Sequence, residues 1–197
     1  EKITGKFSFA VIGDNRPRDD IYRKVIGQVM ERKPNLIVNT GDQIEKPGNR
    51  EMWENFWEMS KAVTVPYFFT IGNHDAHPEV AGSEETYKKQ VNLPGNKLYY
   101  SFVAGNSLFV VLDSYLKGED KRITGEQFKW LERVLASSRQ KNKFVFVHHP
   151  LYPEMGKGKH YGNSLDRYKD IRDRLQALFV KHGVTMVFLG HEHMYLR

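Results

Sequence analysis

The chain has 197 residues, of which 40% are hydrophobic, and its formal net charge at pH 7 is +6. This length and apolar content allow one sizeable buried core, so we expect a single domain over residues 1–197. The sequence contains no cysteine and no apolar run long enough to cross a bilayer, which excludes disulfides, thiolate catalysis, zinc–thiolate sites and a membrane-spanning helix.

Five apolar runs are each followed by residues of the types that bind metal ions. The run 7–12 leads into Gly13-Asp14, 36–38 toward Gly41-Asp42, 67–71 into Gly72-Asn73-His74-Asp75, 144–147 into His148-His149, and 184–189 into Gly190-His191-Glu192-His193. Short runs of this kind are typical of buried strands. Because the carboxyl ends of parallel strands form one edge of a sheet, where ligands bind, we expect these polar residues to converge.

Segments of helical periodicity alternate with these runs, which indicates a wound α/β fold. Apolar side chains recur at helical spacing over residues 19–32, with Asp19 or Asp20 as the expected N-cap, and over residues 51–63. Thr124 and Gln127 have the spacing of a capping box that opens a third helix. A fourth helix is predicted over residues 164–181.

The alternation is interrupted at residues 98–103 and 107–112, which form a predicted β-hairpin. This antiparallel pair indicates a second sheet or a mixed edge. The segments 47–50, 78–94 and 153–163 lack periodicity, so we expect them to be loops that select the substrate, with 153–163 lying over the site.

Both ends of the chain carry an expectation. Residue 1 is Glu rather than Met, so we expect an upstream segment to have been removed, which leaves a cytoplasmic location and export both open. No strand is predicted after His193, so we expect the domain to lack its C-terminal strands. The oligomeric state is also left open.

The polar strand ends supply carboxylate, amide and imidazole donors without sulfur. Imidazole together with carboxylate suits Mn, Fe, Zn or Ni, whereas Ca²⁺ prefers oxygen donors alone. A catalytic zinc uses about three protein ligands, so a set of this size fits two ions better than one. The candidate donors are Asp14, Asp42, Asn73, His148, His191 and His193.

As a set in this order, the motifs resemble those of the calcineurin-like metallophosphoesterases, and residues 148–152 and 190–195 are similar to the purple acid phosphatase-like branch. The resemblance covers nearly the whole chain. It implies an αββα sandwich of mixed sheets flanked by helices. It also implies an enzyme that hydrolyses small phosphomonoesters or phosphodiesters with a hydroxide activated by a dinuclear metal centre.

The resemblance implies roles for individual residues. Asp42 would bridge two divalent or mixed-valence transition metal ions. Asp14 and His193 would complete the ligands of the first ion, and Asn73, His148 and His191 those of the second. His74 would hydrogen-bond a phosphoryl oxygen or protonate the leaving group, with Asp75 holding the His74 ring. His149 follows a ligand directly and is expected just outside the ligand set.

One departure from the family's pattern affects the first ion. Many members have Asp-x-His at the first motif, whereas this chain has Asp14-Asn15-Arg16, and arginine stays protonated and cannot ligate. Purple acid phosphatases also lack that histidine and have a tyrosine three residues after the bridging aspartate, where this chain has Glu45. Glu45 either supplies the missing oxygen or is a solvated loop residue. Arg16 either clamps the substrate phosphate or is a surface cation.

Two other functions stay open on the sequence. The incomplete first site would suit a non-catalytic, metal-binding scaffold of the same fold, although retention of His74 argues against it. The positive charge favours anionic partners and permits a nuclease. Nucleic acid is not favoured, because no basic stripe with interleaved aromatic residues is evident.

Overall fold

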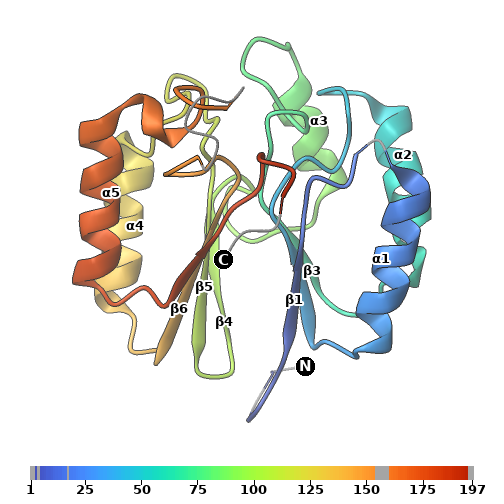
Figure 1. The fold of residues 1–197 in the computed structure, drawn as a ribbon, viewed down its shortest axis with the longest axis horizontal. Helices are drawn as coiled ribbons and strands as arrows, with labels where there is room; N and C mark the ends of the chain where they lie inside the picture. Colours follow the sequence, from blue (N-terminus) through green and yellow to red (C-terminus); the bar gives the residue numbers. More distant parts are fainter. Residues whose placement is uncertain (1–2, 4, 17, 154–159, 195–197) are drawn as a thin grey trace.

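The computed structural model describes residues 3, 5–16, 18–153 and 160–194. Two sheets lie face to face at its centre, and a pair of helices covers the outer side of each, as Figure 1 shows. The predicted αββα sandwich is therefore confirmed. The order of elements along the chain follows the predicted alternation of strands and helices.

The first sheet is parallel and has the order β1-β2-β3. It consists of β1 (Phe9–Ile12), β2 (Leu36–Asn39) and β3 (Tyr67–Phe69), and it is flanked by α1 (Asp19–Glu31) and α2 (Arg50–Met59). Every residue of β2 is buried, as expected of a central strand covered on both faces. The paired residues Val11, Val38 and Phe68 show that the three strands run in register toward one edge.

The second sheet has the order β4-β5-β6-β7, and only β4 runs antiparallel to its neighbour. It consists of β4 (Tyr100–Ala104), β5 (Ser107–Leu112), β6 (Asn142–Val147) and β7 (Met186–Phe188), flanked by α4 (Gly125–Ser137) and α5 (Lys169–Lys181). The predicted hairpin thus starts a second sheet, which resolves the alternative of a mixed edge on the first.

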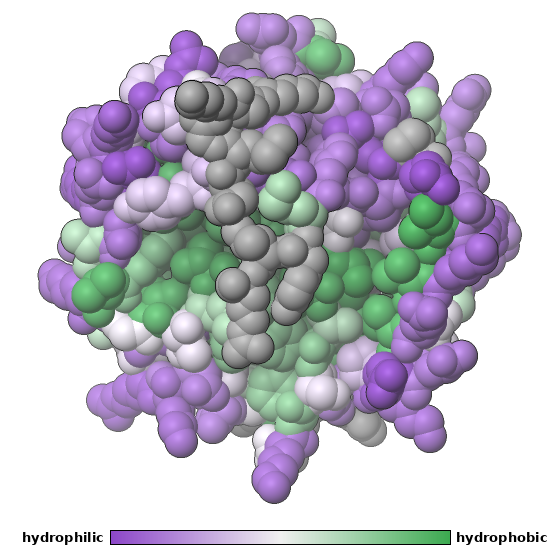
Figure 2. Space-filling model, in the orientation of Figure 1, coloured by the Kyte–Doolittle hydropathy of each residue, from purple (hydrophilic) through white to green (hydrophobic). Residues whose placement is uncertain are grey.

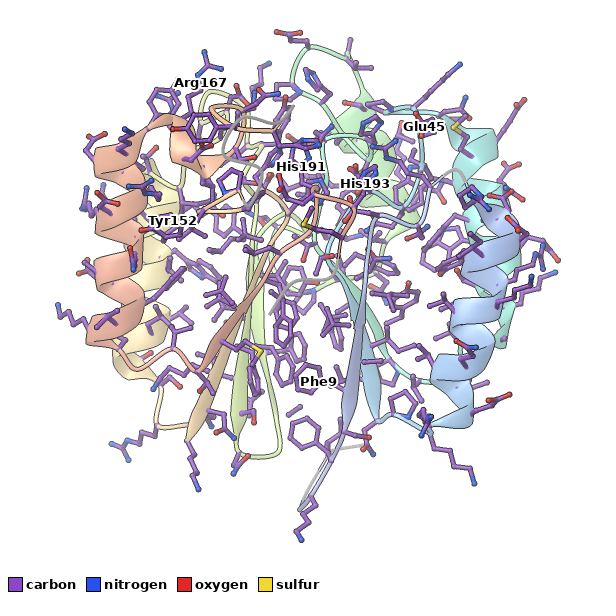
Figure 3. The ribbon with its side chains drawn as sticks, viewed as in Figure 1. Phe9, Glu45, Tyr152, Arg167, His191 and His193 are labelled. Carbon is purple, nitrogen blue, oxygen red and sulfur yellow. The ribbon has the colours of Figure 1, made fainter. Side chains whose placement is uncertain are left out.

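Aromatic side chains from both sheets fill the space between them. The Phe9 ring of the first sheet lies 5.1 Å from both Phe109 and Phe144 of the second, and Phe68 stacks on Phe102 at 3.8 Å. Figure 3 shows Phe9 between the two sheets. Offset and edge-on aromatic pairs add to the free energy of apolar burial, so these contacts hold the two sheets together.

Several predicted boundaries were wrong for local reasons. Arg18 is the N-cap residue of α1, so Asp19 and Asp20 lie in the first turn, where their charges favour the positive end of the helix dipole. The helix predicted over 51–63 is α2, capped by the Asn49 side chain, followed by a 3-10 turn at Ser60–Ala62. The predicted loop 78–94 contains α3 (Ser83–Gln90).

The capping box predicted at the start of α4 was also wrong. The Thr124 side chain makes no capping hydrogen bond. Gln127 instead points into the second sheet, where its amide oxygen accepts from the backbone N–H of Asp113 at 2.8 Å and its amide nitrogen donates to the Asp113 carbonyl at 2.9 Å. A 3-10 turn at Leu165–Arg167 opens the segment predicted as the last helix, and α5 itself begins at Lys169.

The outside of the molecule is mostly polar over the helices. Figure 2 shows hydrophilic residues over the two helical flanks and apolar residues between them, over the sheets. None of the helices in the described part of the chain is both long and apolar enough to cross a membrane.

Replacing Gln127 with Met tests its role as the clamp between α4 and the end of β5. Met keeps most of the packing volume but leaves two buried backbone groups of Asp113 without partners, so we expect a loss of about 2–4 kcal/mol in the free energy of unfolding. Urea unfolding measures this, with Lys129→Met on the exposed face of α4 as the matched control. A urea unfolding midpoint of Gln127→Met equal to that of the control would contradict this role of Gln127.

Candidate metal centre

The strand ends of both sheets converge at one edge, the upper one in Figure 1. Asp14 follows β1, Asp42 follows β2, and His148 follows β6 of the other sheet. One ligand atom from each of these three side chains lies within 4.8 Å of the other two, which is the geometry of a metal-binding group. Figure 3 places His191, His193 and Glu45 at the same end of the molecule.

The backbone is left-handed at Asp14 (φ 49°), Asp42 (φ 59°), His191 (φ 72°) and His193 (φ 52°), which are all predicted metal ligands. Non-glycine residues rarely adopt this conformation, and it persists only where surrounding contacts enforce it. The structure therefore imposes strain on the residues that the sequence singled out.

Two glycines allow the close approach of these loops. A Cβ on Gly72 would lie 2.2 Å from an Asp42 carboxylate oxygen, and a Cβ on Gly41 would lie 2.5 Å from His148 Nδ1. Both distances are far shorter than van der Waals contact. Glycine is thus required at these positions because the ligand side chains pack directly against the backbone.

His148 has one satisfied and one unsatisfied ring nitrogen. Its Nδ1 donates to the Thr40 carbonyl at 2.8 Å, which fixes the ring so that Nε2 faces Asp42 Oδ1, 3.4 Å away. Nε2 is buried and has no hydrogen-bond partner among the described residues, and the same is true of Asn73 Oδ1. Buried polar atoms rarely stay without a partner, and a bound cation would supply one to both of these atoms.

His191 and His193 are anchored through Asp14. The backbone N–H of His191 donates to both carboxylate oxygens of Asp14 at 3.0 Å, and His193 Nε2 lies 3.6 Å from Asp14 Oδ1. The His191 ring lies 5.2 Å from that of His148. His160 Nδ1 lies 2.8 Å from His191 Nε2, a contact that no sequence motif predicts.

The charge of Asp42 is buried and compensated. Its side chain is fully buried, and Arg16 donates to Oδ2 while the His74 backbone N–H donates to Oδ1. Burial alone would raise the pKa of Asp42, but His148 and Arg16 hold it well below its ordinary value. Burial likewise opposes the charged form of His148, but the carboxylates of Asp42 and Asp14 raise its pKa to about 9.

The sequence left two roles open for Arg16 and two for Glu45. The contact between these residues bears on both. Arg16 Nη1 donates to Glu45 Oε2 at 2.6 Å, and only 11% of the Arg16 side chain is exposed. Arg16 is therefore not a surface cation. Glu45, 38% exposed, is paired rather than freely solvated.

Asp75 does not hold the His74 ring, which corrects the expected role. His74 Nδ1 donates to the backbone carbonyl of Glu45 at 2.6 Å. The Asp75 carboxylate is completely buried and accepts from the backbone N–H groups of Asp42, Gln43, Ile44 and Gly72 at 2.7–3.2 Å. Asp75 thus fixes the backbone of the loop that carries Asp42, whereas the ring of His74 is oriented by the Glu45 carbonyl.

His149 lies next to His148 and His191, with ring distances of 5.1 and 4.4 Å, and it belongs to a cluster that the sequence analysis missed. Its Nδ1 lies 2.8 Å from Ser114 Oγ, and its ring stacks on Tyr115 at 5.1 Å. Burial lowers the pKa of His149 well below its ordinary value, which keeps the ring neutral. Asp113, Ser114 and Tyr115 follow β5 at the same edge, so the rule that located the other ligands applied to them as well.

The described part of the chain forms cavities at both ends of the strands. One of about 210 Å³ lies beside the site, and its lining includes His77, Glu84, Asp113, Tyr115 and Lys117. The other, of about 840 Å³, lies at the opposite ends of the strands beside Phe7, Phe9 and Phe144, away from the metal-binding group. Part of the loop predicted to cover the site, residues 154–159, lies outside the described residues.

Comparison with known proteins gives consistent matches. A family model described as calcineurin-like phosphoesterase matches residues 7–195. Purple acid phosphatase 21 of Arabidopsis thaliana is 28% identical over 96% of this chain, and the human serine/threonine-protein phosphatase CPPED1 is 31% identical over 82%. The chain spans 44% and 54% of these relatives, so about half of their length.

A solved structure shares the fold. The purple acid phosphatase PPD1 from yellow lupin seeds matches with a TM-score of 0.80 and 19% sequence identity. The match covers 95% of this chain and 38% of that protein. At this identity the likeness concerns the fold alone.

Replacing Asp75 with Ala tests its role as the anchor of the Asp42 loop. Four backbone N–H groups lose their acceptor, so we expect the free energy of unfolding to fall by at least about 3 kcal/mol. Thermal and urea unfolding measure the change, with Asp170→Ala, at an exposed position of α5, as the control. Unchanged stability with impaired catalysis would instead support a role in holding the His74 ring.

Proposed function

We propose, since the chain belongs to the calcineurin-like phosphoesterase family, that it hydrolyses phosphomonoesters or phosphodiesters at a centre of two transition metal ions. The observation that carries this proposal is the pair of buried, unpartnered donors His148 Nε2 and Asn73 Oδ1 beside the Asp14–Asp42–His148 group. Both atoms belong to the predicted ligand set, where a bound cation would supply the missing partner.

The residues that would hold the ions are those of the predicted set: Asp14, Asp42, Asn73, His148, His191 and His193. When bound, such ions lower the pKa of a water and neutralise phosphoryl oxygens. Imidazole and carboxylate donors suit Mn, Fe, Zn or Ni. The chain's own contribution is to keep Asp42 charged and buried, and to orient His148 Nε2 by fixing the other ring nitrogen on Thr40.

His74 is the candidate for proton transfer to the leaving group. The bond from Nδ1 to the Glu45 carbonyl requires a proton on Nδ1, which leaves Nε2 as the nitrogen that can carry the transferable proton. The His74 backbone N–H also donates to Asp42, so the ring is fixed relative to the carboxylate at the centre of the site. A general acid held in this way requires no covalent enzyme intermediate.

The nuclease alternative remains less favoured. Arginines do contact tyrosines near α5, with Arg122 and Arg167 over the Tyr168 ring at 5.1 and 5.7 Å and Arg172 over Tyr152 at 4.5 Å. These guanidinium groups stack on the ring faces that an unpaired base would need. The surface is therefore less suited to stacking nucleotides than its composition suggests.

Turnover of 4-nitrophenyl phosphate and bis(4-nitrophenyl) phosphate with added Mn²⁺ tests the function. We expect metal-dependent hydrolysis that EDTA abolishes. Asp42→Asn should lower kcat/KM by more than about 100-fold, because losing only an outer partner of a metal ligand already costs about 10–100-fold. Metal binding without turnover above the Asp42→Asn variant would support the scaffold instead.

A comparison of esters with good and poor leaving groups tests whether His74 acts as a general acid. A general acid contributes about 10²–10⁴-fold for a poor leaving group, whereas 4-nitrophenolate leaves with little protonation. We therefore expect His74→Asn to reduce kcat strongly for an alkyl phosphate and weakly for 4-nitrophenyl phosphate. An equal reduction for both esters would assign His74 to binding the phosphoryl group rather than to proton transfer.

A further inference from the structure

The Arg16 guanidinium binds the carboxylate at the centre of the proposed site. Both Nε and Nη2 donate to Asp42 Oδ2, at 3.0 and 2.9 Å, and Nη1 donates to Glu45 Oε2 at 2.6 Å. Three of its N–H groups are thus engaged by two carboxylates. The Arg16 side chain is 11% exposed and that of Asp42 is fully buried, so water does not screen the pair.

The two oxygens of Asp42 have different surroundings. On the His148 side, Oδ1 accepts the His74 N–H and faces the unpartnered His148 Nε2 at 3.4 Å. On the Arg16 side, Oδ2 is already saturated by two donors from one cation. His148, whose Nε2 can lose its proton and bind an ion, therefore lies on one side of Asp42, whereas the other side is held by a guanidinium, which cannot.

An ion and a guanidinium cannot share Oδ2. Arginine has donors only and stays protonated, so it cannot become a ligand when an ion arrives. Two cations on one buried oxygen would repel each other strongly, because little water screens them. An ion bound at Oδ2 would therefore displace Arg16 from Asp42.

We propose that Arg16 competes with the first ion for Asp42, so that the two ions load unequally. The inference rests on the proposed function and deepens it. The ion on the His148 side binds with Arg16 in place, and the ion on the Arg16 side binds only when the guanidinium leaves. Until then Arg16 serves as the cation that keeps the buried Asp42 carboxylate paired.

Glu45 gives the displaced arginine a partner. Its side chain is 38% exposed and already holds Arg16 Nη1, so the guanidinium can keep this contact while it releases Asp42. Glu45 is then a partner of Arg16 rather than a metal ligand. Because Glu45 pairs with Arg16 instead of binding an ion, Arg16 can leave Asp42 without becoming a buried, unpaired charge.

Mn²⁺ binding measured by isothermal titration calorimetry and by equilibrium dialysis tests the competition. For the wild-type chain we expect one tight ion and a second that binds at least ten-fold more weakly. In Arg16→Ala the second ion should tighten by at least ten-fold. Arg18→Ala, which removes a 64% exposed arginine whose ion pair within the described ranges is with Asp20, is the control and should match the wild type.

Thermal unfolding supplies a readout that does not depend on activity. In EDTA, Arg16→Ala should melt below the wild type because Asp42 loses its cation, and saturating Mn²⁺ should raise its melting temperature more than it raises that of the wild type. Glu45→Gln provides a second variant if Arg16→Ala does not fold. It removes the charged partner that the displaced arginine needs without touching Asp42, so it should weaken binding of the second ion further.

The outcomes separate this inference from the proposed hydrolysis. Two ions bound with equal affinity, or a second affinity unchanged in Arg16→Ala and Glu45→Gln, overturns the competition even if esters are hydrolysed. Unequal loading that Arg16→Ala relieves supports the competition even if no ester is turned over. Absence of Mn²⁺ binding by the wild type and both variants at millimolar concentration overturns both proposals.

Discussion

A carboxylate without access to water constrains the rest of this molecule. Burying an unpaired charge is costly, so the Asp42 side chain requires positive charge and hydrogen-bond donors around it. Arg16 follows β1, His74 follows β3 and His148 follows β6, and all three face Asp42. Compensation of one charge therefore draws together loops from both sheets, which explains why the site lies where the two layers meet rather than on either sheet alone.

A second buried carboxylate supports the first at the level of the backbone. Asp75 satisfies the N–H groups of three consecutive residues, starting with that of Asp42 itself, and of Gly72. A turn whose N–H groups are bound by one carboxyl group in this way can hold Asp42 at a positive φ, which its own side chain disfavours. The strain at Asp42 is thus balanced by the hydrogen bonds that Asp75 accepts from the backbone around it.

The sequence was sufficient for what depends on chain direction and periodicity. Parallel strands that end at one edge predicted the convergence of Asp14, Asp42 and His148, and the structure brings these three side chains together. It was insufficient where a side chain had several polar partners to choose from. Gln127 bonds β5 instead of its own helix end, and α3 lies in a segment whose weak apolar pattern gave no helical signal. Both outcomes depend on tertiary neighbours that spacing does not specify.

Arg16 shows most clearly where motif matching stops. The motif Asp14-Asn15-Arg16 differs from Asp-x-His by one residue. From the sequence alone, this difference indicates only the loss of one metal ligand. A histidine at this position would offer a neutral nitrogen with a lone pair. Arg16 is instead a permanent cation with N–H groups only. Because its target, Asp42, is an anion that must be paired in any case, the arginine is drawn into the same place that a metal ion would take. A residue that cannot ligate can therefore still determine how a metal site is filled.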